Sequence, residues 1–231
     1  MLQTIWVTVK LAMVTTPLLL GVGIGLAWWL ERHAQLHPYG LRHWLGEGLA
    51  AMVTLPMILP STVLGFYLLV ALGAQGLGGW VAGLWGATSL AFSFGGLVIG
   101  SLVYSLPFVV QPLRNGFAAI GRQPLEVAAS LGATRWHGLW RVALPLNRRA
   151  IVAASLLGFA HTIGEFGLVL MIGGNIAGET RVLSIAIYDE VETLNWTRVH
   201  WLAGGLVLLS FTLSLALNRL LRGRERERDR S

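Results

Sequence analysis

Long apolar runs alternate with short polar segments along this chain. Five runs approach the roughly 20 residues that a helix needs to cross a bilayer core of about 30 Å. They lie at 11–30, 49–72, 91–111, 150–172 and 201–221. A sixth apolar stretch, 77–90, is short and rich in glycine, so we interpret it as an interfacial or re-entrant segment. The pattern predicts an all-α integral membrane protein, with residues 1–231 forming a single transmembrane domain.

The composition supports a membrane protein over a soluble one. The chain is 55% hydrophobic and 12% charged, whereas a soluble domain carries about 25% charged residues. It has no cysteine, which excludes disulfides, cysteine-bound metal clusters and thiol catalysis. The first apolar run is longer than the core of a signal peptide, and no small-residue cleavage motif follows it. We therefore expect this run to stay in the protein as a span.

Positive charges are divided unevenly between the two sides of the predicted membrane. With five spans, one side carries fourteen Lys and Arg residues and the other carries three. Cytoplasmic segments are enriched in these residues, so we expect the N-terminus outside and the C-terminus in the cytoplasm. The segment 112–149 is then cytoplasmic, whereas 173–200, which holds four acidic residues, is external.

The cytoplasmic segment 112–149 contains signals for two short helices. Pro124 suits the first turn of a helix, and Glu126 there is favoured by the helix dipole. Gly132 suits a left-handed stop, and Thr134 can cap a second helix. That helix, which we expect to end at Leu144-Pro145, places on one face Trp136, Leu139, Trp140 and Ala143. Two interpretations are open: an amphipathic hairpin on the membrane surface, or a docking element for a soluble partner.

The spacing within this segment resembles the EAA loop of the permease subunits of bacterial ABC importers. The family pattern is E-A-A-x3-G-x9-I-x-L-P, and this chain departs from it mildly at Val127 and Val142. In that family the loop is a coupling helix that sits in a cleft of the ATPase subunit. The resemblance assigns ATPase coupling to Glu126, Ala128, Gly132, Leu144 and Pro145.

Three further segments narrow the resemblance to the molybdate-transporter permeases, whose relatives carry tungstate or sulfate. They are Leu55-Pro56-x3-Pro60-x2-Val63-x-Gly65, Gly164-Glu165-Phe166-Gly167 and Asn175-Ile176-x-Gly178-Glu179-Thr180-Arg181. The resemblance implies a MetI-like type I importer fold in a bacterial inner membrane. It also implies a homodimer of permeases, two cytoplasmic ATPase subunits and an external oxyanion-binding protein. Sulfate or tungstate transport is the alternative within the family.

The chain has no nucleotide-binding motif of its own. The pattern G-x-x-x-x-G-K-[ST] does not occur, and the only lysine is Lys10. An ATPase must therefore be supplied by another subunit, and we expect this chain to be neither an enzyme nor a cofactor, metal or nucleic-acid binder. An intramembrane enzyme would need a convergent nucleophile and base. A scaffold or receptor subunit would leave the EAA spacing unexplained.

Candidate pathway or gate residues are Pro60, Ser61, Thr62, Gly164 and Glu165. Prolines in a span remove helix hydrogen bonds, and the result is either a kinked packing helix or a break that lines the pathway. Hydroxyl groups beside such a break can guide an anion without trapping it. A charged residue within a span marks a functional site by default. Because a carboxylate repels an anion, we favour a structural or gating role for Glu165, with His161 as its partner.

Candidate residues for docking the external binding protein are Glu179, Thr180 and Arg181. The arginine has two simpler interpretations, which are attraction of an oxyanion and pairing with Glu179. We expect docking or loop structure at these positions more than a substrate site.

Overall fold

The computed structural model describes residues 1–36, 39–84 and 86–228, with side chains as far as 219. In these residues the chain is all-helical, which confirms the predicted fold class. The elements are α1 (Leu2–Leu36), α2 (Leu41–Ile58), α3 (Ser61–Leu72), α4 (Leu77–Gly83), α5 (Phe94–Ile120), α6 (Gln123–Ser130), α7 (Arg135–His137), the π-helical turn η1 (Gly138–Ala143), α8 (Leu144–Leu146), α9 (Arg148–Gly164), α10 (Gly167–Gly173), α11 (Leu183–Glu192) and α12 (Trp196–Arg228).

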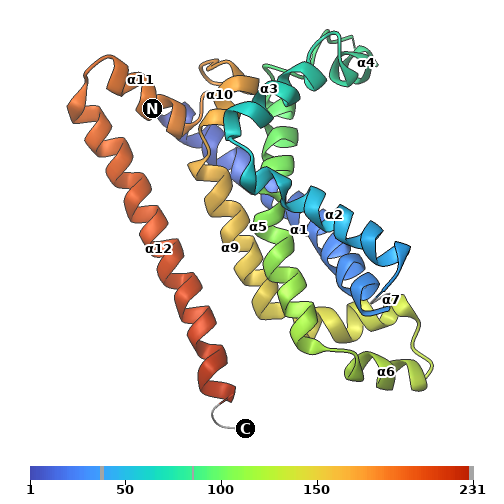
Figure 1. Ribbon diagram of the computed structural model, residues 1–231. Helices are drawn as coiled ribbons and strands as arrows, with labels where there is room; N and C mark the ends of the chain where they lie inside the picture. Colours follow the sequence, from blue (N-terminus) through green and yellow to red (C-terminus); the bar gives the residue numbers. More distant parts are fainter. Residues whose placement is uncertain (37–38, 85, 229–231) are drawn as a thin grey trace.

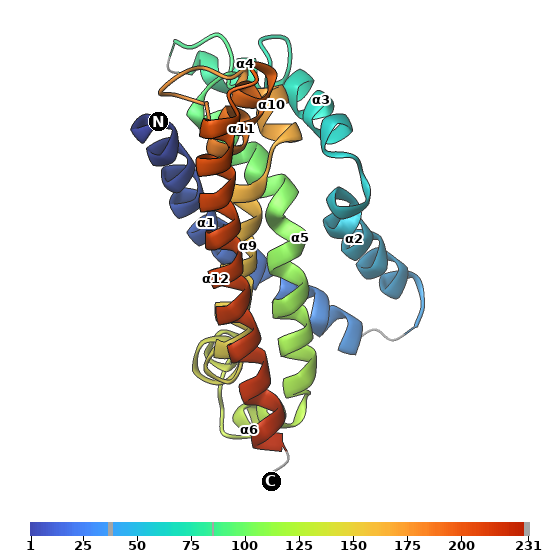
Figure 2. The same cartoon turned by 90° about the vertical axis from the view of Figure 1, so that its left-hand side faces the viewer.

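Three helices are individually long and apolar enough to cross a membrane: α1, α5 and α12 over Trp196–Arg219. Two bent pairs raise the number to five if each pair is one span. Helices α1, α5 and α9 pack side by side, and α12 runs along α9 (Figures 1 and 2). The N-terminus, α3, α4, α10 and α11 lie at one end of the molecule, whereas α6, α7 and the end of α12 lie at the other (Figure 1).

The apolar run 49–72 is a sharply bent pair of helices rather than one helix. The axes of α2 and α3 differ by 111°. Pro60 stands at the bend and begins α3 in an extended conformation. Pro56 lies inside α2 without ending it. Of the two interpretations of these prolines, the structure supports a break at Pro60.

Two other predicted boundaries also differ from the structure. The run 91–111 continues as α5 to Ile120, because Pro112 is accommodated inside the helix. The run 150–172 is interrupted after Gly164, where Glu165 is extended, and resumes as α10. Helix α10 packs against α3 and α5, and Gly65 of α3 lies against Met171 and Leu168. These contacts between distant segments favour two short helices over one long helix.

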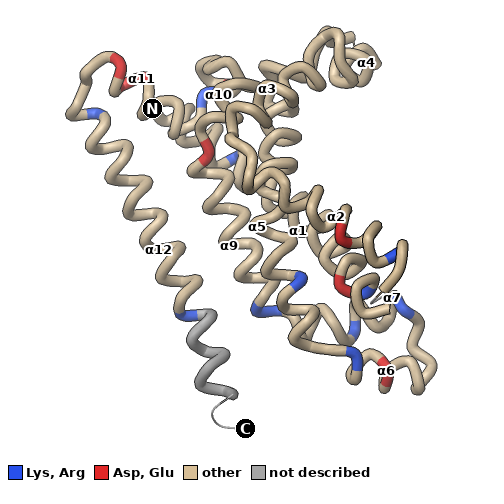
Figure 3. Tube along the Cα trace, in the orientation of Figure 1, with Lys and Arg blue, Asp and Glu red and all other residues tan. Residues whose placement is uncertain are grey.

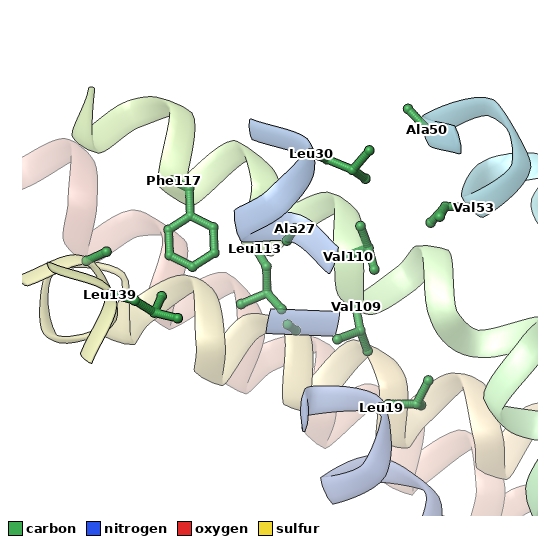
Figure 4. Packing of buried hydrophobic residues seen from close by; sticks show 12 residues of the cluster. Leu19, Ala27, Leu30, Ala50, Val53, Val109, Val110, Leu113, Phe117 and Leu139 are labelled. Atoms are coloured by element: carbon green, nitrogen blue, oxygen red, sulfur yellow. The ribbon is translucent and has the colours of Figure 1, made fainter. Parts of the chain in front are cut away.

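Two apolar cores stabilise the bundle. The inner core joins α1, α2, α5, η1 and α9 and is shown in Figure 4; its fully buried members include Leu19, Val109 and Leu113. The outer core joins the start of α1 to α5, α10 and α11 and is formed by Val7, Leu11, Leu97, Leu168, Val169, Ile172, Val182 and Ile185. Buried polar residues lie between the two cores: Thr15 on α1, Ser101 and Ser105 on α5, Thr162 on α9 and Glu165 after α9.

The segment 77–90 forms the short helix α4 at the tip of the end of the molecule that holds the N-terminus (Figure 1). Its seven residues are too few to cross a bilayer. After α4 the chain returns to the end of α3, where the amides of Leu90 and Ala91 both donate to the carbonyl oxygen of Leu72. Its position relative to the lipid stays a prediction.

Candidate functional site

The segment that follows α5 has the helix–corner–helix geometry that the sequence predicts. Pro124 lies in the first turn of α6 and Glu126 follows it, where its carboxylate pairs with Arg122 at 3.1 Å. Gly132 has φ +85°, a left-handed conformation that a residue with a Cβ rarely adopts. The Thr134 hydroxyl accepts from the backbone N–H of His137. Local sequence therefore determines this corner.

The second half of the segment differs from the predicted amphipathic helix. It continues from α7 into the π-helical η1, whose i+5 hydrogen bonds change the spacing of side chains, and then into α8. Leu139 and Ala143 are buried in the inner core, but Trp136 is 65% exposed and Trp140 is 53% exposed. The expected shared face is therefore wrong. The helical segment ends at Leu146, directly after Leu144-Pro145, as expected.

The outer surface of this segment is apolar and open. Val127 and Leu131 are 55% and 84% exposed, and the Trp136 ring packs edge-on against Trp140 with 5.5 Å between centroids. The apolar side chains lie at the end of the molecule where Lys and Arg residues gather (Figure 3). Exposed apolar groups with charged neighbours are typical of a surface that docks a protein or contacts a membrane.

A cavity of about 450 Å³ lies at the two helix breaks. It is lined by Ser61, Thr62, Tyr104, His161, Gly164, Glu165, Phe166 and Gly167. Four of the five candidate pathway residues thus meet in one place, and Pro60 directly precedes Ser61. Gly167 allows this meeting, because a Cβ there would collide with the Ser61 side chain. We call this space the helix-break cavity.

The Glu165 carboxyl does not reach the surface of this cavity. The residue is 5% exposed, and both carboxyl oxygens are buried without a hydrogen-bond partner among the described residues. The Ser101 hydroxyl of α5 is likewise buried without a hydrogen-bond partner among the described residues. The cavity therefore presents no carboxylate oxygen to a ligand.

The expected pair between His161 and Glu165 is not formed. His161 Nδ1 instead lies 2.9 Å from the Ser105 hydroxyl. The imidazole stacks on Phe108 with 3.9 Å between ring centroids and contacts Tyr104. Contacts across α5 and α9 thus hold the histidine, which the i, i+4 spacing could not predict. Among the described residues there is also no cluster of three potential metal ligands.

The loop between α10 and α11, which the charge pattern predicts to be external, is held by two of the side chains that the sequence suggests for docking. Thr180 is fully buried; its hydroxyl accepts from the Ile176 amide at 2.9 Å and donates to the Gly173 carbonyl at 2.6 Å. This side chain therefore holds the loop together and presents no surface to a partner. Arg181 does not pair with Glu179, because its Nε donates to Asn175 at 2.6 Å and lies 3.6 Å from Asp189.

Asn175 and Asp189 complete this arrangement and were not singled out as site residues beforehand. The Asn175 amide donates to both Asp189 oxygens, at 3.0 and 3.1 Å. Asn175 is also one of the non-glycine residues with positive φ, at 60°. The Asn-Ile motif thus has a structural explanation: asparagine tolerates the left-handed turn and links the loop to α11.

The fold, the broken helices and the corner between α6 and α7 define a membrane permease, and the chain belongs to the family described as the binding-protein-dependent transport system inner membrane component. The family model matches residues 20–227. The chain is therefore a protein of a bacterial inner membrane. A solved permease of similar fold is that of the MetNI methionine ABC transporter in inward-facing conformations, with a TM-score of 0.68 at 18% identity over 96% of this chain and 94% of that one.

Relatives within the family agree with the resemblance to molybdate-transporter permeases. The molybdenum transport system permease protein ModB of Azotobacter vinelandii is 50% identical over 94% of this chain and 92% of its own length. The ModB protein of Escherichia coli K12 is 30% identical over 96% of this chain and 95% of its own length. The sulfate transport system permease protein CysW of that organism is 33% identical, over 97% of this chain but 74% of its own length.

Proposed function

We propose that this chain is the transmembrane permease subunit of an ATP-driven importer of molybdate. The observation that carries the proposal is the 50% identity, along nearly the full length of both chains, to a molybdenum transport permease. The identities to the two E. coli permeases, 30% and 33%, do not by themselves separate molybdate from sulfate. The matched length favours molybdate, since the sulfate permease extends well beyond the match. Tungstate and sulfate remain the alternative substrates.

The anion crosses at the helix-break cavity. Its polar lining is neutral, with hydroxyls from Ser61, Thr62 and Tyr104 and one imidazole. Neutral donors bind an oxyanion weakly enough to release it. The buried position of the Glu165 carboxyl supports this assignment, because an exposed carboxylate would repel the substrate. Motion of the break between α9 and α10 would then open or close the path.

The cytoplasmic corner couples the permease to a separate ATPase subunit. The exposed Val127, Leu131 and Trp136 fit an apolar groove on a soluble partner. Glu126, Ala128, Gly132, Leu144 and Pro145 maintain its shape. Two permease chains form the pathway, and an external binding protein that carries the anion docks at the exposed Glu179 and the half-exposed Arg181. This arrangement requires the N-terminus outside and the C-terminus inside, which the charge distribution in Figure 3 supports.

The experiment is uptake of labelled molybdate by cells that lack this chain. We expect high-affinity uptake to be lost and to return with the wild-type gene. Excess unlabelled molybdate should compete strongly and sulfate weakly. The Ser61→Ala/Thr62→Val variant should reduce uptake, with Ser214→Ala on α12 as the matched control. If the wild-type gene restored sulfate uptake and not molybdate uptake, molybdate would be refuted as the substrate. If no ATPase co-purified with the chain, its role in an ATP-driven importer would be refuted.

A further inference from the structure

Arginine side chains converge where the C-terminal end of α1 meets the segment 121–147 between α5 and α9, which we call the coupling loop. Arg32 and Arg135 line a cavity of about 350 Å³. Its walls are completed by Trp28, Trp29, His33 and Leu36. An adjoining cavity of about 150 Å³ is again lined by Arg32 and is reached by Arg122. We call the larger space the Arg32–Arg135 cavity.

The positive charge of this cavity is not neutralised by the chain itself. Arg122 is paired with Glu126 at 3.1 Å. Glu31, the acid beside Arg32 in sequence, pairs instead with Arg114 at 3.5 Å. Within the part of the chain that the structure describes, no carboxylate lies within 4.0 Å of the guanidinium nitrogens of Arg32 or Arg135. Arg122 and Arg135 also act on Arg32 as repelling neighbours. An anion bound here would relieve that repulsion.

The walls of the cavity are suited to an anion that carries hydrocarbon. The Arg32 guanidinium lies 5.0 Å from the centroid of the Trp28 ring. Trp29 stacks on His33 with 4.8 Å between ring centroids, and Leu36 is 51% exposed. Tryptophan is enriched at the level of lipid headgroups, whereas a small inorganic anion gains nothing from an apolar wall.

We propose that the Arg32–Arg135 cavity binds the phosphate group of an anionic phospholipid, with an acyl chain alongside Trp28 and Trp29. Guanidinium groups bind phosphate through paired N–H donors, and basic pockets beside the membrane surface bind anionic headgroups. Because Arg32 belongs to α1 and Arg135 to the coupling loop, one phosphate bridges the two elements. The lipid thereby holds the loop against α1. The assignment to the cytoplasmic leaflet rests on the orientation proposed above.

The test uses the purified complex of this permease with its ATPase, in nanodiscs of mixed phosphatidylcholine and phosphatidylglycerol. Native mass spectrometry counts the phosphatidylglycerol retained after detergent release. We expect Arg135→Gln to weaken retention about five-fold, and Arg32→Gln to do the same. The matched control is Arg141→Gln, an exposed arginine of the same loop outside the cavity lining. Because Arg135 is exposed, its variant should fold even if the Arg32 variant does not.

Two further measurements distinguish a bound lipid from other occupants of the Arg32–Arg135 cavity. Inorganic phosphate or molybdate that displaces the lipid at millimolar concentration would show a site for free oxyanions and would overturn the proposal. Loss of ATPase binding in Arg135→Gln with full lipid retention would also overturn it, because the arginine would then contact the ATPase. Neither outcome bears on which anion the importer carries, so molybdate uptake is tested separately.

Discussion

At the scale of single residues, the structure separates a buried side chain of the loop 174–182 from a half-exposed one. Thr180 and Arg181 are adjacent in sequence, yet the first is fully buried and the second is half-exposed. Sequence motifs mark both equally. Both side chains bond within the loop, and only their burial in the structure distinguishes them.

Thr180 provides a direct test of this distinction. Thr180→Val keeps the shape but leaves the Ile176 amide and the Gly173 carbonyl without their partner. We expect a loss of about 1–3 kcal/mol in stability, measured by thermal unfolding of the purified complex. Thr180→Ser, which keeps the hydroxyl, should remain near wild type and should bind the external protein normally. Weak binding of that protein by a stable Thr180→Ser variant would restore a docking role.

Glu165 is expected to respond differently to a neutral isostere and to a truncation. Glu165→Gln removes a buried ionisable group that has no hydrogen-bond partner in the described residues, so the unfolding temperature should hold or rise. Glu165→Ala leaves a void and should cost about 2 kcal/mol. The exposed Glu179→Gln serves as the control in thermal unfolding. Equal destabilisation by Gln and Ala would mean that the carboxyl itself makes an essential contact.

At the scale of elements, we expect a substitution at the corner between α6 and α7 to have a large effect on transport. Gly132→Val places a β-branched residue at φ +85°, which costs about 1–3 kcal/mol of backbone strain. We expect substrate-stimulated ATPase activity and uptake to fall together while the permease still inserts. Gly138→Ala is the matched control, because its new Cβ would meet only Leu125 at an ordinary 3.6 Å. Normal uptake by Gly132→Val would count against the coupling assignment.

The sequence predicted the helices and this corner well, but it did not predict where the helices break. Pro124, Gly132 and Thr134 act on their own neighbours, so local rules suffice. The interruption at Glu165 depends on α10 packing against α3, more than one hundred residues away in sequence. Pro112 was expected to lie beyond the span, yet α5 includes it. Hydropathy is the same for a straight helix and a broken one.

The cavity residues illustrate the same limit. The proline–hydroxyl pattern at 60–62 and the Gly-Glu-Phe-Gly pattern each identified one wall of the helix-break cavity. Tyr104 was missed because a tyrosine in an apolar run carries no distinguishing signal. His161 was noticed but given the wrong partner, since Ser105 is 56 residues away.

At the scale of the whole molecule, the orientation is open to a direct test because the chain has no cysteine. Ser130→Cys lies at the end of α6, and Ala177→Cys lies in the external loop; both sites are exposed. In intact cells or spheroplasts, a membrane-impermeant maleimide should label Ala177→Cys and leave Ser130→Cys unlabelled. Inside-out vesicles should reverse the pattern. Labelling of Ser130→Cys from outside would refute the cytoplasmic coupling loop.

The sparse packing of α12 has a consequence for handling the protein outside a bilayer. In the apolar window of Trp196–Arg219, 6% of residues are buried inside the chain, and the helix contacts α11 and α9. Acyl chains solvate such a helix about as well as protein does, so its surroundings hold it in place. A short-chain detergent should displace α12 before it melts either core, and spectroscopy on the extracted protein would then report a conformation that the native bilayer does not favour.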